Sequence, residues 1–490
     1  MSGDVIQSAT GEKALPKRPV LWRPVTILSW ALVCLAVLLM AVFRFIAEPL
    51  GFLADPARTV IHVGDKSLDL NEAVRRAPGW ERATYAILGS MPADHMRNVA
   101  DAYGRAAAHV EGDGSEYSRA DWRGADALRA RQAILAAESD AWWGLVENLF
   151  SRLSESEHEY PFISALSFAY RSVPVGIQVT PQIEDLSILG VETNESWAYD
   201  VVLMRIAEQV DSDHSLDFEA RILDRGRRAL NRSRVIGAVY VSFLVVGGIV
   251  AMRRRTIFRR GYEIAGGLTV APWSLKYGLD VLARFVVCAA AILVLALAMT
   301  DSLYVVSSLL AGLPMLLLSR RYYFGPHGLS LTKALGLEGV SWKTLIPFTL
   351  ALIAVDQGGA LLITGITNAF GLESGLEEGI EETLLFGRPA MAGLLAIDGI
   401  VSASFMEEVA FRGLLYTTLR SRCRPLPAAL ISASLFGVVH IYSLAGLLII
   451  VWTGFVLALA YERCRSLWPC VLAHSFNNLL YFADQVLLYR

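Results

Sequence analysis

Residues 235–252 read VIGAVYVSFLVVGGIVAM, a run of 18 residues without a charged side chain. A helix that crosses the hydrocarbon core of a membrane needs about 20 consecutive, mostly apolar residues. Three arginines, Arg253, Arg254 and Arg255, follow the run directly. Because Lys and Arg collect in cytoplasmic loops, this stretch predicts a transmembrane helix that ends at the cytoplasmic surface.

Similar apolar runs recur along the chain, and the composition agrees with them. Hydrophobic residues make up 54% of the 490 residues and charged residues 19%, whereas soluble domains carry about 25% charged residues. We therefore predict an all-α fold, a polytopic membrane helix bundle of about nine transmembrane helices. The apolar runs are 24–43, 235–252, 281–299, 303–318, 345–366, 390–419, 426–442, 445–461 and 467–488.

Orientation follows from the basic residues of the short loops. If the N-terminus is cytoplasmic, every strong basic loop lies on the cytoplasmic side, and the loop 367–389 on the other side is acidic. Six arginines between 221 and 234 lie on the proposed outer side, but long loops translocate largely regardless of charge. We expect a multi-pass protein of a bacterial inner or cell membrane. The basic loops are 253–260, 320–321, 420–424 and 463–465.

The apolar runs divide the chain into five expected segments. A cytoplasmic tail, 1–23, and a first transmembrane anchor, 24–43, precede a mostly helical extracytoplasmic domain, 48–234. Transmembrane helices 2–5 and their cytoplasmic loops occupy 235–384. The C-terminal core, 385–490, contains the remaining spans.

The polar domain 48–234 has the bulk for a core of its own but contains no catalytic motif. None of the five cysteines falls in it, which argues against a secreted disulfide scaffold. We expect it to bind an extracytoplasmic partner, whereas the net charge of −3 gives no indication of nucleic acid. Its tryptophans are Trp80, Trp122, Trp142, Trp143 and Trp197. Its histidines, which lack ligand spacing, are His62, His95, His109, His158 and His214.

Ionisable side chains inside an apolar span cost free energy, so each of them is expected to have a structural or functional role. Glu407 and Glu408 interrupt the run 390–419, and Arg412 lies four residues after Glu408, on the same helix face. Pairing of Glu408 with Arg412 leaves Glu407, about 100° around the helix, free to face elsewhere. A buried carboxylate without a partner is a candidate general base.

The next span places an imidazole at a matching depth. Glu407 precedes the turn at 423–424 by about as many residues as His440 follows it. Both then lie on the order of 20–25 Å from the cytoplasmic face, so they can meet in an antiparallel helix hairpin. A carboxylate and an imidazole that share a water can activate it as a nucleophile.

The last span adds two hydrogen-bond donors. His474 and Asn478 are four residues apart, on one helix face. Aimed at a developing oxyanion, they would stabilise it by several kcal/mol. A base, a water partner and two donors suffice for amide hydrolysis without a covalent intermediate. We therefore expect a peptide-bond hydrolase. Its substrate would be a membrane-anchored or lipidated protein that enters the site from the cytoplasmic side.

Other polar residues in the spans are Asp356, Gln357 and Asp398. Asp398 precedes Glu407 by nine residues, about half a turn away on the helix. We expect it to face a neighbouring helix or the lipid headgroups rather than the site.

Three short motifs together resemble a known family. Residues 407–412 match E-E-x-x-x-R, residues 436–440 match F-x-x-x-H and residues 474–478 match H-x-x-x-N. In this order, on successive apolar segments, they resemble the CPBP family of intramembrane glutamic endopeptidases, the type II CAAX-prenyl-protease group. The resemblance covers about 385–490, roughly a fifth of the chain.

The resemblance implies roles for individual residues. Glu407 and His440 would activate water, and His474 and Asn478 would form an oxyanion hole. Glu408 and Arg412 would support the first helix, and Phe436 and Asn477 are candidates for positioning substrate. Eukaryotic relatives cleave prenylated CAAX proteins, and no cofactor or metal is implied.

Three other functions remain open. Glu407, Glu408, His440 and His474 would be the ligands of a zinc metallopeptidase, although no H-E-x-x-H helix is present and Arg412 opposes a cation. A transporter would explain inward-facing ionisable residues. A non-proteolytic scaffold or immunity protein of the same family would retain the motifs without hydrolysis.

Overall fold

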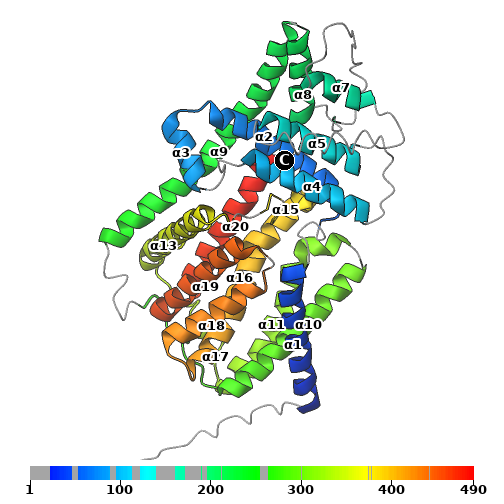
Figure 1. Cartoon of the computed structure of the whole chain (residues 1–490). Helices are drawn as coiled ribbons and strands as arrows, with labels where there is room; N and C mark the ends of the chain where they lie inside the picture. Colours follow the sequence, from blue (N-terminus) through cyan, green and yellow to red (C-terminus); the bar gives the residue numbers. More distant parts are fainter. Residues whose placement is uncertain are drawn as a thin grey trace, which may run out of the picture.

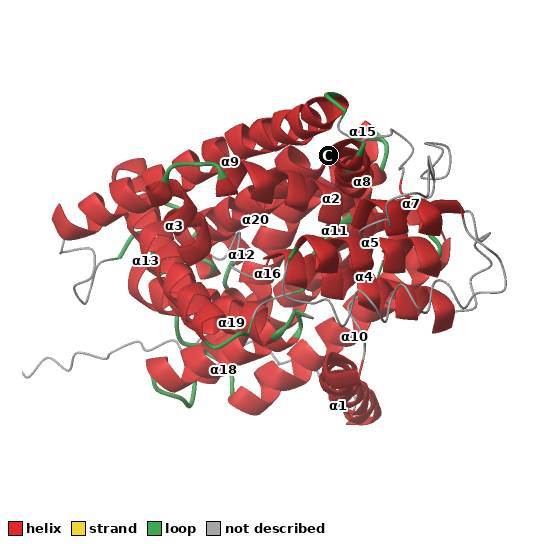
Figure 2. Cartoon of the chain, turned by 45° about the horizontal axis from the view of Figure 1, so that its top comes forward, coloured by secondary structure: helices red, strands yellow, loops and turns green. Residues whose placement is uncertain are grey.

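The computed structural model describes thirteen stretches of the chain, and their regular secondary structure is entirely helical. The predicted all-α class is therefore confirmed. A bundle of long helices carries a cluster of shorter helices at one end (Figures 1 and 2). The described residues are 23–46, 53–88, 95–112, 122–139, 161–170, 189, 196–210, 212–253, 263–299, 301–372, 375–376, 378–440 and 442–490. The tail 1–22, Trp142, Trp143, His158 and the basic residues 254–260 lie outside them.

Each of the nine predicted apolar runs overlaps a described helix or helical segment, although the run 426–442 extends past its helix, which ends at Val438. Six described helical segments have the length and hydropathy of a membrane span, so the count of about nine transmembrane helices stays a prediction. These six are α9 (His214–Arg253), α10 (Leu275–Met299), the segment Leu303–His327 around α11 (Ser307–Ser319), α13 (Trp342–Ala369), the segment Pro389–Arg420 and α19 (Leu444–Cys464). The other runs correspond to α1 (Arg23–Ile46), α18 (Pro425–Val438) and α20 (Trp468–Tyr489).

The described residues of the predicted domain 48–234, which we call the outer domain after its predicted side, pack around an apolar core of their own. Trp197 is buried in it and Trp122 packs against it, whereas Trp80 is 73% exposed and does not contribute the bulk that the sequence suggested. The helices are α2 (Pro56–Arg75), α3 (Gly79–Leu88), α4 (His95–Gly112), α5 (Ala125–Glu138), α7 (Pro161–Tyr170), α8 (Trp197–Gln209) and the first part of α9.

A buried ion-pair network fastens α9 to this domain. The guanidinium of Arg225 donates to Asp69 of α2 at 2.8 and 3.1 Å and to Asp200 of α8 at 2.5 Å. Buried carboxylates of this kind require such partners. Because α9 runs for 40 residues, about 60 Å at 1.5 Å per residue, it connects the domain rigidly to the bundle.

The described histidines of the outer domain are core or surface residues, as expected. His95 is buried, and desolvation lowers its pKa to about 4. The ring of His62 contacts the Tyr489 carbonyl at the end of α20. His214 is exposed beside Asp217.

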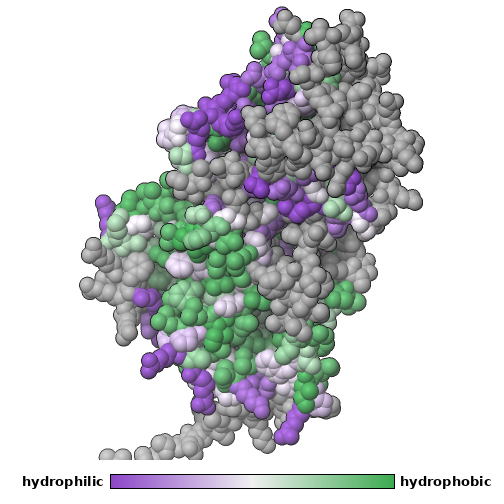
Figure 3. Space-filling model, viewed as in Figure 1, coloured by the Kyte–Doolittle hydropathy of each residue, from purple (hydrophilic) through white to green (hydrophobic). Residues whose placement is uncertain are grey.

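The two ends of the bundle differ in charge. In Figure 3, hydrophobic residues predominate in the coloured part of the bundle, and hydrophilic residues gather on the outer domain and at the far end of the bundle. At the far end, Ala271 N donates to Thr417 O at 3.0 Å, and Gly267 N donates to Arg465 O at 2.9 Å. These bonds join the segment 263–274 to the loops 420–424 and 463–465, and the Tyr277 hydroxyl donates to the Tyr322 carbonyl, beside the loop near 320, at 2.8 Å. We call the described residues of these three basic loops the basic end. The outer domain and the described acidic residues of the loop 367–389 lie at the opposite end.

Candidate active site

The helical segment that carries the first motif is irregular on both sides of it. Two π-helical turns, η7 (Asp398–Ala403) and η8 (Val409–Tyr416), flank α16 (Ser404–Glu408). α15 (Pro389–Ile397) and α17 (Thr417–Arg420) complete the segment. A π turn inserts an extra residue and shifts the helix face, and such turns occur frequently at functional sites. Here they set the directions in which Glu407 and Glu408 point.

Glu408 and Arg412 form the predicted pair. Arg412 Nη1 donates to Glu408 Oε1 at 2.8 Å, and both side chains are almost completely buried. Arg412 Nη2 donates to the Gly454 carbonyl of α19 at 3.3 Å. The guanidinium also lies 4.6 Å from the centre of the Phe436 ring, within range of a cation–π interaction. The pair therefore joins the Glu407 helix to α18 and α19.

Glu407 faces both motif histidines, so the structure brings the three together. Its Oε2 atom lies 3.9 Å from His440 Nε2 and 3.8 Å from His474 Nε2. Oε2 is buried and has no hydrogen-bond partner among the described residues. Both separations exceed a direct hydrogen bond but are compatible with a bridging water.

The other ring nitrogen of each histidine fixes its tautomer. His440 Nδ1 lies 2.7 Å from the Phe436 carbonyl, which can only accept, so Nδ1 carries a hydrogen. His474 Nδ1 lies 2.9 Å from Glu408 Oε1, a carboxylate already paired with Arg412, so this Nδ1 also donates. In both rings, Nε2 is therefore the atom that faces Glu407 and is available for chemistry.

Phe436 supports the site from α18. Its ring centre lies 4.8 Å from that of His440 and 5.8 Å from that of His474, with edge-on geometry in both cases. The ring is 2% exposed, so it packs against the two imidazoles and Arg412 and is not accessible at the surface. Its predicted role in positioning substrate stays a prediction.

Asn477 faces α13 and is held at both ends of its amide. Its Nδ2 donates to Asp356 Oδ2 at 2.7 Å, and its Oδ1 accepts from Gln357 Nε2 at 2.6 Å. Asp356 Oδ1 accepts from Thr453 of α19 at 2.8 Å. The sequence marks Asp356 only as a polar residue in an apolar span. Its partners, on helices about 100 residues away, become visible only in the structure.

Asn478 contacts the π turn before Glu407. Its Nδ2 donates to the Gly399 carbonyl at 2.7 Å and to Ser404 Oγ at 3.2 Å. A π turn leaves carbonyls without their usual helical donors, and Asn478 satisfies one of them. Its amide hydrogens are thus engaged, which differs from the free oxyanion donor that the sequence predicted.

Asp398 lies away from the site, as expected. Its carboxylate accepts from Ser308 N at 2.9 Å and from Leu309 N at 3.1 Å, at the N-terminus of α11. A carboxylate at this position satisfies unpaired amides and the positive end of the helix dipole. Asp398 therefore holds two spans together.

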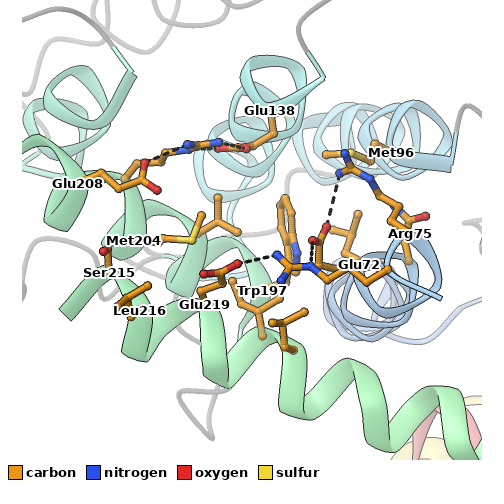
Figure 4. Close-up of a pocket in the computed structure, with 17 residues that line it drawn as sticks. Glu72, Arg75, Met96, Glu138, Trp197, Met204, Glu208, Ser215, Leu216 and Glu219 are labelled. Atoms are coloured by element: carbon orange, nitrogen blue, oxygen red, sulfur yellow. Dashed lines mark hydrogen bonds and ion pairs between the residues drawn. The ribbon is translucent and has the colours of Figure 1, made fainter. Parts of the chain in front are cut away.

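The remaining polar features do not form a second reactive centre. Within the described residues, no group of three or more His, Cys, Asp or Glu side chains could hold a metal ion. The outer domain contains a cavity of about 280 Å³ (Figure 4). Trp197 and Arg205 line it, and Arg205 bridges Glu138 and Glu208. Whether a partner binds there stays a prediction.

The fold and this site define an integral, multi-pass membrane protein with a buried polar centre inside its helix bundle. Residues 389–480 match the family model described as Type II CAAX prenyl endopeptidase Rce1-like, which confirms the resemblance carried by the three motifs. The chain is 32% identical over 85 residues, 17% of its length, to YdiL of Bacillus subtilis (strain 168), whose name describes a candidate membrane peptidase. The alignment covers 34% of that relative. No solved structure matches the chain.

Proposed function

We propose that this protein is an intramembrane endopeptidase that hydrolyses a peptide bond of a membrane-associated protein substrate. The observation that carries the proposal is the convergence of His440, just after α18, and His474 of α20 on the carboxylate oxygen Oε2 of Glu407, which has no hydrogen-bond partner among the described residues. The family match and the relative support the same class of reaction. A prenylated CAAX-type substrate is one candidate within this class.

In the proposed mechanism, Glu407 and His440 activate water. The water donates one hydrogen to Glu407 Oε2 and the other to His440 Nε2, so that a lone pair on its oxygen points toward the scissile carbonyl carbon. Attack forms a C–O bond and moves a proton from the water to this pair. The same groups then protonate the leaving nitrogen as the C–N bond breaks.

His474 is the proposed donor to the oxyanion. In its protonated form, Nδ1–H stays on Glu408 and Nε2–H points into the site, where negative charge develops in the transition state. Asn478 would join it only if its bonds to Gly399 and Ser404 exchanged on substrate binding. We therefore assign Asn478 primarily to positioning the helix turn that precedes Glu407.

The zinc alternative receives less support from the same geometry. One oxygen of Glu408 is held by both Arg412 and His474, and a nearby guanidinium opposes a cation. Activity that survives strong chelators in a metal-free preparation would agree with the glutamate mechanism.

The test is Glu407→Gln, which keeps the shape of the side chain and removes the base. Cleavage should fall by about 10²–10⁴-fold, the usual contribution of a general base. Quantitative proteomics of membranes from cells that express each variant would measure the accumulation of an uncleaved substrate. Glu263→Gln is the matched control, because Glu263 pairs with Arg465 at the basic end. Equal cleavage in Glu407→Gln would refute the assigned base, and unchanged cellular function would favour a scaffold.

A further inference from the structure

The path from the site to the basic end is closed by packed side chains. α20 begins at the basic end, where the Trp468 indole donates to the Leu337 carbonyl at 3.3 Å. His474 follows six residues later, about 9 Å along the helix. Two large side chains that contact residues toward the basic end are fully buried: Tyr416, whose hydroxyl donates to Glu462, and Tyr461, whose hydroxyl donates to the Leu268 carbonyl. Cys470, between Trp468 and His474, is fully buried as well.

The opposite side of the site is more open. The side chains of Glu407 and His440 are 33% and 26% exposed, whereas Glu408 is completely buried. The ring of His440 stacks on Tyr442, with ring centres 6.1 Å apart and planes 10° from parallel. The next residue, Ser443, donates its backbone N–H to Glu378 at 2.6 Å. The reactive groups therefore face the end of the bundle that carries the acidic loop.

The acidic loop is in turn fastened to the outer domain. Glu382 accepts hydrogen bonds from Ala54 N at 2.6 Å and Asp55 N at 3.1 Å, at the start of α2, and from the Thr59 hydroxyl. The Gly379 carbonyl accepts from Gln485 of α20 at 3.1 Å. The side of the site away from the basic end thus leads to this loop and to the outer domain.

We propose that the site opens toward the face that carries the outer domain, so that its substrate is a membrane-anchored polypeptide whose cleaved segment lies on that face. With the basic loops in the cytoplasm, this face is extracytoplasmic. The substrate class is then an exported protein cut in its extracytoplasmic juxtamembrane segment, not a cytoplasmic tail. This inference rests on the proposed peptidase function, and it differs from the cytoplasmic entry that the sequence suggested.

The native cysteines allow a test that needs no activity. In a background with the exposed Cys34 and Cys288 changed to alanine, His440→Cys adds a thiol in the site. Cys423 marks the basic end, and the buried Cys470 marks the packed path between them. Right-side-out and inverted membrane vesicles are treated with a small cationic, membrane-impermeant methanethiosulfonate. Peptide mass spectrometry then locates each modified thiol.

We expect the His440→Cys thiol to react only in right-side-out vesicles and Cys423 only in inverted ones, with Cys470 unmodified in both. Ser432→Cys on α18, the helix that ends two residues before His440, is the matched control, because Ser432 is 1% exposed and should not react from either face. Reaction of the His440→Cys thiol from the same face as Cys423, or from neither face, would overturn the proposal. Reaction of Cys423 from outside would place the outer domain in the cytoplasm and overturn the exported substrate class. None of these outcomes depends on Glu407, whose own test decides whether the protein is a peptidase.

Discussion

Glu408 and Arg412 show what the site requires of single residues. Two charges inside a bundle lose their hydration, and their mutual attraction compensates only when the geometry is good and the remaining polar atoms find partners. Here Arg412 also bonds the Gly454 carbonyl, and Glu408 also bonds His474. A pair that would contribute little on a surface therefore orients the imidazole of His474.

Removal of Glu408 should be costly for stability. Glu408→Ala leaves the buried guanidinium of Arg412 without its carboxylate, and we expect the free energy of unfolding to fall by about 3–5 kcal/mol. Denaturant unfolding in detergent, followed by far-UV circular dichroism, measures the change. Glu263→Ala is the control, because the exposed pair of Glu263 and Arg465 should contribute about 0–1 kcal/mol. Similar losses in the two variants would contradict this role for Glu408.

Helix α13 contributes to the site although it contains none of the three motifs. Its consecutive residues Asp356 and Gln357 hold the Asn477 amide, one turn from His474 on α20. Asp356 also accepts a hydrogen bond from Thr453, whose neighbour Gly454 accepts a hydrogen bond from Arg412 through its carbonyl. α13 therefore sets the positions of both α19 and α20 relative to the Glu407 helix.

We predict that Asp356→Ala lowers the turnover number on the order of 10-fold to 100-fold, because small shifts of catalytic groups have effects of this size. Asp356→Asn should restore most of the activity. If the amides of Asn477 and Gln357 rotate, the new amide can still bond both Asn477 and Thr453. Turnover of a substrate trapped with the Glu407→Gln variant provides the assay.

Thr364→Ala is the control on the same helix, since the Thr364 hydroxyl donates to the Ala360 carbonyl within α13 itself. If Asp356→Asn were as inactive as Asp356→Ala, the charge rather than the hydrogen bonds of Asp356 would matter. If both variants kept full activity, α13 would have no positioning role.

At the scale of the whole molecule, two connections between the outer domain and the bundle add to the contact of His62 with the Tyr489 carbonyl. α9 passes without a break from the buried Arg225 network into the membrane. The second connection is Glu382, from α14 (Glu382–Phe386), whose carboxylate meets the N-terminus of α2. A carboxylate there satisfies amides that have no helical partner and interacts favourably with the helix dipole.

Glu382→Ala should loosen this second connection. We expect the amides of residues 54–59 to exchange faster with deuterium. The free energy of opening should fall by about 1.5 kcal/mol, the low end of the range for hydrogen bonds to a charged group. Hydrogen–deuterium exchange of the full-length protein measures this. Glu338→Ala is the control, because Glu338 bonds Thr332 at the basic end. Unchanged exchange at 54–59 would show that Glu382 does not fasten the outer domain to the bundle.

The sequence by itself determined the class of fold and the candidate residues of the site. Apolar runs of membrane length can only be satisfied as helices in lipid, and costly ionisable residues such as Glu407, Glu408 and His440 stand out within them. The i,i+4 spacing of Glu408 and Arg412 was also sufficient to predict their contact, because both partners lie on one helix.

Only the tertiary structure decided how these residues divide their roles. Contacts between distant helices fix which nitrogen of His440 faces Glu407, hold Asn477 against Asp356 and commit Asn478 to Gly399. Such contacts depend on how helices rotate and pack, and the π turns around Glu407 change the face that residue counting assumes. The side on which the site is open was likewise hidden from the sequence, since burial follows from packing around the whole bundle.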